Sequence, residues 1–390
     1  MKKMSIKIIL IFITINQPIL YSYRITTLKN ILNQYPEIVY QKVCDEISFT
    51  MPPFQIAPSF PNKGYFKELF ILTIPNGIVK GLHGYILIND GFIEELIWGG
   101  IKNLYNIVSH AQQIDYNNII KIPGRVAVIA QLESKNYCHL ICEILGRLAL
   151  LEIHNIEYDY LYVPYEQQPL VQSIFKLWGI DPTIIISPCD HNFAIEAEIL
   201  IVPSLVIRTD TDYKQSGNFH HPQTMAYVKN KLLNKALQEK VDPKSFNKKV
   251  FISRSDSPSG RRIANENEIF ELFEKKGFTR YIPSKLSIPE QVILFHNAEI
   301  IVAEHGAALT NILFCKPNTH IIEIFQNLIP IDFCHCAYLN NLKYTPINTL
   351  LSEQDANYYS DYHKDLHKFF SFPIQPNVPL DKLYQILDTL

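Results

Sequence analysis

Short apolar runs alternate with amphipathic segments through the second half of the chain. Apolar positions that recur every three to four residues predict helices, and short, uniformly apolar runs predict buried strands. The predicted strands lie at residues 249–253, 278–282, 300–303 and 320–325, and the predicted helices at 265–276, 288–298 and 307–314. Such alternation is typical of βαβ units with a parallel sheet, which binds ligands at the carboxyl ends of its strands.

The ends of two predicted helices carry local signals. Asn265 with Glu268, and Ser287 with Glu290, have the spacing of a capping box, in which each side chain accepts from the other residue's backbone N–H. Gly277 follows the first of these helices, where a C-terminal glycine is expected. We therefore predict a capping box at the start of both helices and a stop at Gly277.

The first half of the chain divides into two regions. Residues 25–110 have short apolar runs interrupted by glycine and proline, which predicts short strands and turns. From residue 124, strands and helices alternate again, until a polar stretch at 205–224 breaks the pattern. The predicted parts are a distinct N-terminal segment at 1–22, a strand-rich region at 23–120, and α/β domains at 121–220 and 221–390.

Composition narrows the class of protein. With 390 residues, 47% of them hydrophobic, the chain is long enough for two domains with large cores. The net charge of -2 disfavours a nucleic-acid partner, because proteins that follow a phosphate backbone carry a basic excess. The 7 cysteines are odd in number and include no CxxC pair, so neither a disulfide framework nor a zinc site is expected.

The N-terminal segment has two interpretations. Lys2, Lys3 and Lys7 precede an apolar run at residues 8–15, which is the outline of a signal peptide without its small-residue cleavage site. The segment is then a targeting or membrane-associating element, or else a first buried strand. The predicted location is cytoplasmic, with peripheral membrane association through residues 1–22 as one interpretation and the secretory lumen left open.

An arginine-rich loop follows the predicted strand at 249–253. It contains Ser253, Arg254, Arg261 and Arg262. Guanidinium groups pair bidentately with phosphate oxygens, and hydroxyl groups add donors. The loop is therefore a candidate diphosphate site, and the alternative is a solvated surface loop.

A second cluster lies where the strand at 300–303 passes into a helix, in the sequence Glu304–Asn311. Gly306 and two alanines would let a ligand approach the backbone, and the amides at a helix start attract anions. His305 could donate to a phosphate oxygen. Glu323 interrupts an apolar strand, which is costly unless the carboxylate is paired or binds a ligand. The alternatives are a tight turn and a salt-bridged glutamate.

A third cluster lies on the predicted helix at 136–152. His139, Glu143 and Arg147 share one helix face, and the pair His139–Glu143 is a candidate general base. The alternative is a surface salt-bridge ladder. A metal site on this face lacks an evident third ligand. Asp210-Thr211-Asp212 has the DxD form by which some transferases hold a nucleotide diphosphate through a metal, although such triplets are common in loops.

Together the three clusters resemble the family 61 glycosyltransferases, which include bacterial capsular-polysaccharide proteins and plant xylan-decorating enzymes. The matching stretches, in the family's order and spacing, are Asn136–Glu143 with Gly146-Arg147, Phe251–Arg254 with Gly260–Arg262, Glu304–Asn311, and Ile322-Glu323. The helix departs from the family pattern, because Leu140 replaces an aromatic residue, Glu143 an aspartate and Gly146 a proline.

The resemblance implies an α/β fold of the GT-B type, with two facing Rossmann-like domains around the active site. Residues 121–220 would form the acceptor domain and residues 221–390 the nucleotide-sugar-binding domain. The implied reaction is the inverting transfer of one sugar from a nucleotide-sugar donor, with a UDP-sugar favoured, to a hydroxyl of a glycan or polysaccharide such as a capsule. No cofactor and no bound metal is expected, because protein cations and a helix dipole would stabilise the leaving diphosphate.

The resemblance also implies roles for residues. The implied donor-binding residues are Ser253, Arg254, Arg261, Arg262, His305, Gly306, Ala307, Ala308, Asn311 and Glu323. In that scheme the arginines offset the diphosphate charge, His305 and the amides after it hold the phosphates, and Glu323 holds the ribose. His139 or Glu143 would be the catalytic base.

Two other functions stay open at this stage. A non-catalytic nucleotide-binding module would need residues 251–325 but not the helix at 136–147. A metal-dependent hydrolase would use His139, Glu143 and either His220 or His221, and would leave the arginine loop unexplained.

Overall fold

The computed structural model describes residues 24–52, 63–89, 91–98, 119–207, 220–257, 263–325, 332–348, 378 and 380–387. These residues form two compact units. One holds the described residues at 24–49, 63–207 and 220–228, and the other those at 50–52 and from 229 onward. Each unit is described by itself.

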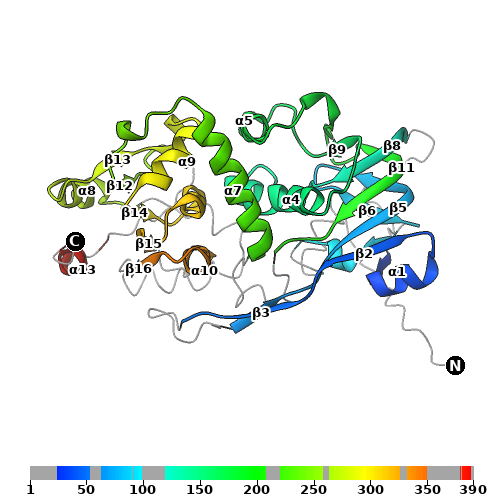
Figure 1. Ribbon diagram of the computed structural model, residues 1–390, viewed down its shortest axis with the longest axis horizontal. Helices are drawn as coiled ribbons and strands as arrows, with labels where there is room; N and C mark the ends of the chain where they lie inside the picture. The colour runs from blue at the N-terminus through cyan, green and yellow to red at the C-terminus, as the bar shows by residue number, and fades with distance from the viewer. Residues whose placement is uncertain are drawn as a thin grey trace, which may run out of the picture. The chain divides into compact units, whose positions relative to one another are not determined.

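The first unit is built on a nine-stranded sheet of the described residues (Figure 1). Its strands are β1 (Arg24–Thr26), β2 (Val39–Cys44), β5 (Leu69–Lys80), β6 (Tyr85–Ile88), β7 (Gly91–Ile93), β8 (Ile120–Val128), β9 (Tyr160–Tyr162), β10 (Ile185–Ile186) and β11 (Ala194–Pro203). The order is β1-β7-β6-β5-β11-β8-β9-β10, and β2 pairs with β5. Strands β11, β8, β9 and β10 are parallel, whereas β5 runs antiparallel to β11.

Strand β5 joins the two regions that the sequence pattern separates. It belongs to the predicted strand-rich region at 23–120, yet it pairs with β11 of the range 121–220 from Ala194↔Lys80 to Pro203↔Ile71. Leu72, Val126 and Leu200 are fully buried in one core cluster with residues of both ranges. Both regions therefore share one sheet and one core.

The helices of the first unit cover this sheet. They are α1 (Leu28–Gln34), α3 (Tyr137–His139), the π-helical turn η3 (Leu140–Ile144), α4 (Leu145–Ile153) and α5 (Pro169–Trp178). The predicted single helix at 136–152 is thus interrupted, because five residues adopt the wider π geometry that is frequent at functional sites. In α4, a Cβ at Gly146 would lie 2.7 Å from Val206 Cγ2, so the glycine allows close packing there.

The second unit contains a five-stranded, all-parallel sheet (Figure 1). Its order is β13 (Thr279–Tyr281), β12 (Lys249–Ile252), β14 (Ile300–Glu304), β15 (His320–Phe325) and β16 (Lys343–Asn348). The helices are α8 (Glu266–Glu274), α9 (Ile288–Asn297), the 3₁₀ helix η7 (Ala307–Phe314), α10 (Asp332–Leu339) and α13 (Leu380–Leu387). The predicted parallel βα alternation is confirmed here, and both units have the predicted α/β class.

Several further elements complete the described chain. The strands β3 (Ile47–Thr50) and β4 (Lys63–Phe66) pair with each other. Short 3₁₀ turns lie at Glu94–Leu96, Pro182–Ile184, Pro243–Ser245 and Pro283–Lys285. The chain passes from the first unit to the second within α7 (Pro222–Gln238).

The two predicted capping boxes have different outcomes. Ser287 and Glu290 form the predicted box at the start of α9, and Gly277 follows α8 with a φ of 86°. The prediction of a capping box at Asn265 is wrong, since the Asn265 side chain makes no capping hydrogen bond. Its amide instead exchanges hydrogen bonds with the backbone of Val378, at 3.2 and 3.0 Å, so a distant segment competes for the cap.

Some predicted features fall outside the described residues. These are the segment 1–22, the triplet Asp210–Asp212, and Arg261 and Arg262. Within the described ranges, no helix is both long and apolar enough to cross a bilayer.

Candidate active site

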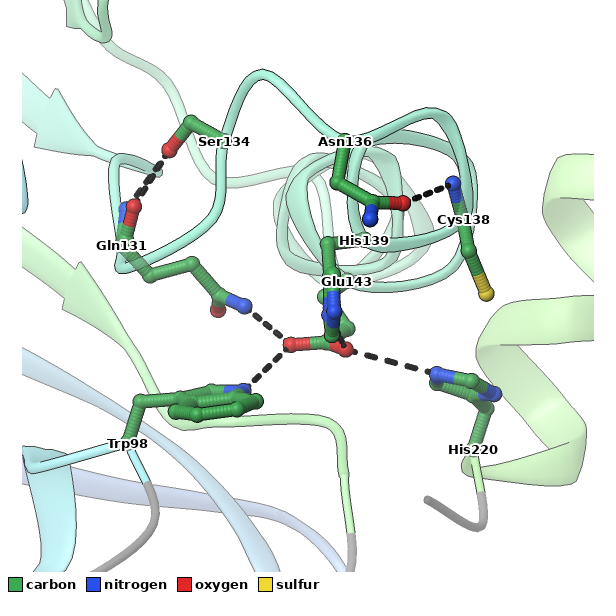
Figure 2. A network of polar contacts seen from close by, with 8 residues as sticks. All are labelled: Trp98, Gln131, Ser134, Asn136, Cys138, His139, Glu143 and His220. Carbon is green, nitrogen blue, oxygen red and sulfur yellow. Dashed lines mark hydrogen bonds and ion pairs between the residues drawn. The ribbon is translucent and has the colours of Figure 1, made fainter. Parts of the chain in front are cut away.

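A buried histidine–glutamate pair lies in the first unit, where α3 passes into the π-helical turn. His139 Nδ1 is 2.5 Å from Glu143 Oε1 (Figure 2). The Glu143 side chain is fully buried and the His139 side chain is 13% exposed. Among the described residues, none bonds to His139 Nε2, so that nitrogen can meet a substrate. The predicted pair is therefore a buried site and not a surface ladder.

The buried carboxylate of Glu143 is held by several donors around it. Oε2 accepts from Trp98 Nε1 at 2.8 Å and from the Gln131 side-chain amide, and Oε1 lies 3.4 Å from His220 Nε2 (Figure 2). The Trp98 ring also meets His139 edge-on, with ring centroids 5.5 Å apart. A carboxylate held in this way can stay ionised despite its burial.

The pair shifts the pKa of both members. Burial lowers the pKa of His139, but the charge and hydrogen bond of Glu143 outweigh it and raise the pKa to about 9. For Glu143, burial raises the pKa, and the contacts with His139 and His220 outweigh that effect and lower it below its usual range. The favoured state is therefore an imidazolium–carboxylate pair.

Arg147 does not join this pair, although it shares the predicted helix face. Its guanidinium donates to the carbonyl oxygen of Pro203 at 2.8 and 3.2 Å, and to that of Ala130 at 2.7 Å. Burial lowers the pKa of Arg147 to about 9, against the opposing effect of Glu143. Because Pro203 ends β11 and Ala130 closely follows β8, Arg147 fastens the carboxyl ends of two neighbouring strands.

A second histidine–glutamate pair lies in the other unit, where His305 directly follows β14 and Glu323 lies on the neighbouring strand β15. His305 Nδ1 is 2.6 Å from Glu323 Oε1, and Glu323 Oε2 accepts from the Tyr344 hydroxyl at 2.6 Å. Glu323 is fully buried, and the His305 ring lies against Phe325 and Phe333, at centroid distances of 5.7 and 5.4 Å. No described residue bonds to His305 Nε2, and the side chain is 18% exposed.

Arg254 lies against the turn that follows β14. Its Nη1 donates to the carbonyl oxygen of His305 and its Nη2 donates to Ser257 Oγ at 3.3 Å. A Cβ at Gly306 would collide with this guanidinium. The small residue at 306 therefore makes room for the arginine. Burial lowers the pKa of Arg254, and the charges of Glu304 and Asp256 oppose that effect.

The other predicted donor-site residues surround this turn. Ser253 Oγ donates to Glu266 Oε1 at 2.7 Å, which holds the start of the arginine loop against α8. Ala307 and Ala308 begin η7, and the first N–H groups of a helix have no acceptor within it. Asn311 is buried, and its amide donates to Gln291 Oε1 and Ala308 O. In this structure Asn311 fastens η7 to α9.

Sequence reasoning missed Trp98, Gln131 and Tyr344, which reach the two glutamates from other segments. The one sequence signal for such donors is a carboxylate in an apolar stretch, and that signal does not say where the donors lie.

His221 is the alternative to His220 in the sequence analysis, but its Nε2 faces Cys44 Sγ at 3.7 Å and its ring meets Phe66 edge-on. Burial lowers the pKa of His221 to about 4.

Comparison with known proteins identifies the domain that holds most residues of the two pairs. A search of curated proteins found no match. Residues 137–322 match the model of the family described as Glycosyltransferase 61. That stretch includes both histidines, Glu143, Arg254 and the turn at Gly306, and it ends just before Glu323. The chain is a glycosyltransferase that carries a domain of family 61.

Proposed function

We propose that this glycosyltransferase moves a sugar, with inversion, from a nucleotide-sugar donor to a hydroxyl group of a glycan acceptor. The favoured donor is a UDP-sugar. We also propose that the two units are the Rossmann-like domains of a GT-B fold. The observation that carries the proposal is the buried pair His139–Glu143, whose geometry suits a general base.

The proposed base is His139 Nε2. Glu143 accepts from Nδ1–H, which fixes the ring and leaves Nε2 to take the proton of the acceptor hydroxyl. The carboxylate also stabilises the imidazolium that forms. A single displacement by the acceptor oxygen then breaks the bond between the sugar and the diphosphate, and it inverts the configuration at the sugar carbon.

The proposed donor site lies in the second unit. The electron pair of the broken bond goes to the leaving diphosphate, so charge must be offset there. Arg254 supplies a fixed positive charge, and the first amides of η7 supply donors. Glu323 holds the His305 ring and itself accepts from the Tyr344 hydroxyl, and a protonated His305 would donate from Nε2 to a phosphate oxygen. Both oxygens of Glu323 thus bond protein groups. We therefore propose that Glu323 orients His305, in place of the ribose-binding role that the resemblance implies.

A metal is not required for this scheme, because protein groups offset the diphosphate charge. The competing scheme holds the diphosphate through a hard divalent cation at Asp210 and Asp212. The cytoplasmic location, with membrane association through residues 1–22, stays a prediction.

Calorimetric titration of the full chain with UDP, GDP and CMP, with and without excess chelator, tests the proposal. Saturable binding of UDP that survives chelation supports it and justifies a screen of UDP-sugars for transfer. If none of the three nucleotides binds, the proposal is contradicted. Binding that disappears with chelator overturns the metal-independent scheme and favours Asp210 and Asp212 as ligands.

A further inference from the structure

Two thiols and an imidazole meet beside Glu143, and the proposed reaction uses none of them. The ligand atoms of Cys138, Cys142 and His220 all lie within 4.8 Å of one another. Cys142 and His220 are buried, and Cys138 is half-buried. Figure 2 shows the Cys138 thiol and the His220 ring on the same side of Glu143.

Local structure brings the two cysteines onto one face. Asn136 caps α3 by accepting from the Cys138 backbone N–H at 2.9 Å, which fixes the backbone of the first cysteine. Cys142 lies four residues further, inside the π-helical turn. Residues spaced by four lie on one side of a helix, so both sulfurs face the same neighbour.

The neighbour is His220, which comes from a distant part of the sequence. An isolated β-bridge joins Ile207 and His220, and the next residue donates its backbone N–H to Val206 O at 2.9 Å. These contacts fix the backbone of His220 just before α7. The spacing of the two cysteines therefore gave no sign of a third ligand, which only the fold supplies.

We propose that Cys138, Cys142 and His220 bind one Zn²⁺ ion, with a fourth position open to water. Two thiolates and one imidazole are ligands that Zn²⁺ prefers, and three protein ligands with an open position form a known type of zinc site. Ligands about 2.0–2.3 Å from a tetrahedral ion lie about 3.3–3.8 Å apart, so small side-chain movements from the described positions close the site.

This site differs in chemistry and role from a metal that holds a diphosphate. Mg²⁺ and Mn²⁺ prefer oxygen ligands, whereas sulfur ligands select a thiophilic cation. The ion would fix the His220 ring, whose Nε2 lies 3.4 Å from Glu143 Oε1. We therefore assign it a positioning role beside the histidine–glutamate pair. The inference does not depend on which sugar or nucleotide the enzyme uses.

The proton balance of binding follows from the ligands. Each thiol must lose its proton to become a thiolate ligand, while the imidazole binds in its neutral form. Uptake of one Zn²⁺ near neutral pH should therefore release about two protons to the buffer. Neither oxidation nor reduction is involved.

Cobalt titration of the reduced, metal-free full chain tests the proposal, because Co²⁺ reports thiolate ligands by colour. We expect saturation at one equivalent, a thiolate-to-cobalt charge-transfer band, the visible bands of a tetrahedral ion, and displacement by Zn²⁺. Cys138→Ser and Cys142→Ser should each weaken the charge-transfer band, because only one thiolate is left, and should weaken binding on the order of 100-fold. Cys189→Ser is the matched control, because Cys189 is exposed and lies outside the cluster.

Other outcomes overturn the proposal. Titration without a charge-transfer band, or equal binding by all three variants, would exclude thiolate ligation at this cluster. A protein purified under mild conditions with a Cys138–Cys142 disulfide, and with no metal uptake after reduction, would make the pair a redox pair. If Cys142→Ser fails to fold, Cys138→Ser and His220→Ala still decide the result, with circular dichroism as the folding control.

Discussion

Nδ1 of His139 lies 2.5 Å from Oε1 of Glu143, and the glutamate has no exposed surface. The contact raises the pKa of His139 to about 9, because a charged ring is stabilised by the buried carboxylate despite its own desolvation. At pH 7 only about one molecule in a hundred then has the neutral ring that a base requires. The proposed base is therefore scarce in its active, neutral form, but it is a stronger base than a free imidazole.

The pH dependence of transfer follows from this pair. A base must be deprotonated, so kcat/KM should rise with pH and level off near the pKa of His139, about 9. Glu143→Gln removes the carboxylate, so the profile should shift to lower pH and its plateau should fall about 100- to 10,000-fold. The measurement is the pH–rate profile of both proteins. Glu157→Gln, on a side chain that is 78% exposed, should match the wild type. An unshifted profile in Glu143→Gln would remove Glu143 from the mechanism.

Substitutions in the second unit should weaken nucleotide binding, whereas substitutions at His139 in the first unit should lower turnover. Arg254→Ala removes a buried positive charge beside the turn after β14 and should weaken UDP binding at least tenfold, since hydrogen bonds to charged groups contribute about 1.5–3 kcal/mol. His139→Ala should leave UDP affinity unchanged and lower kcat. Calorimetry and initial rates measure the two effects. Arg125→Ala, at a surface ion pair, is the control. Equal loss of binding in both variants would contradict the division of roles.

Gly306 and Arg254 should behave as one unit. Gly306→Ala places a methyl group where the guanidinium lies, so it should displace Arg254 and reduce UDP affinity to about the level of Arg254→Ala. The double variant should then bind no more weakly than either single variant, because residues in contact are not additive. A double-mutant cycle measured by calorimetry checks this. Additive losses would show that the two residues act separately.

Tyr344 should affect stability and UDP affinity through its hydrogen bond to Glu323. Tyr344→Phe removes a donor from a fully buried carboxylate, and such a loss costs about 1–3 kcal/mol of unfolding free energy. If Glu323 orients His305, the same change should also weaken UDP binding. Urea unfolding and calorimetry measure both effects. Tyr338→Phe is a suitable control. Among the described residues that hydroxyl bonds only the backbone of Thr50, and Tyr338 is 43% exposed. Unchanged stability and affinity would leave His305 without this support.

Sequence patterns correctly predicted the features that depend on residues close together in the chain. The parallel sheet of the second unit follows from its alternation, and that topology puts Arg254 and His305 at the ends of adjacent strands, β12 and β14. The box at Ser287 and the stop at Gly277 also depend on residues close in sequence. These features needed no knowledge of distant contacts.

Distant contacts decided the rest. Asn265 bonds Val378 and makes no cap, and Arg147 bonds two strand ends where a pattern on one helix face suggested a partner in Glu143. The further donors to the two buried glutamates, Trp98, Gln131 and Tyr344, come from other segments. A buried carboxylate requires partners, but sequence spacing carries no information on which remote side chains supply them.

The pairing of β5 with β11 constrains when the pair His139–Glu143 can form during folding. Residues 69–80 are synthesised long before residues 194–203. The edge of β5 that pairs with β11 therefore has no partner strand while the helix with His139 is made. Pairings that are distant in sequence form late and are exposed to aggregation until they do. We expect the pair His139–Glu143 to reach its final geometry only after β11 joins the sheet. A protein shortened to residues 1–119 should expose the edge of β5 that β11 covers, and it should aggregate.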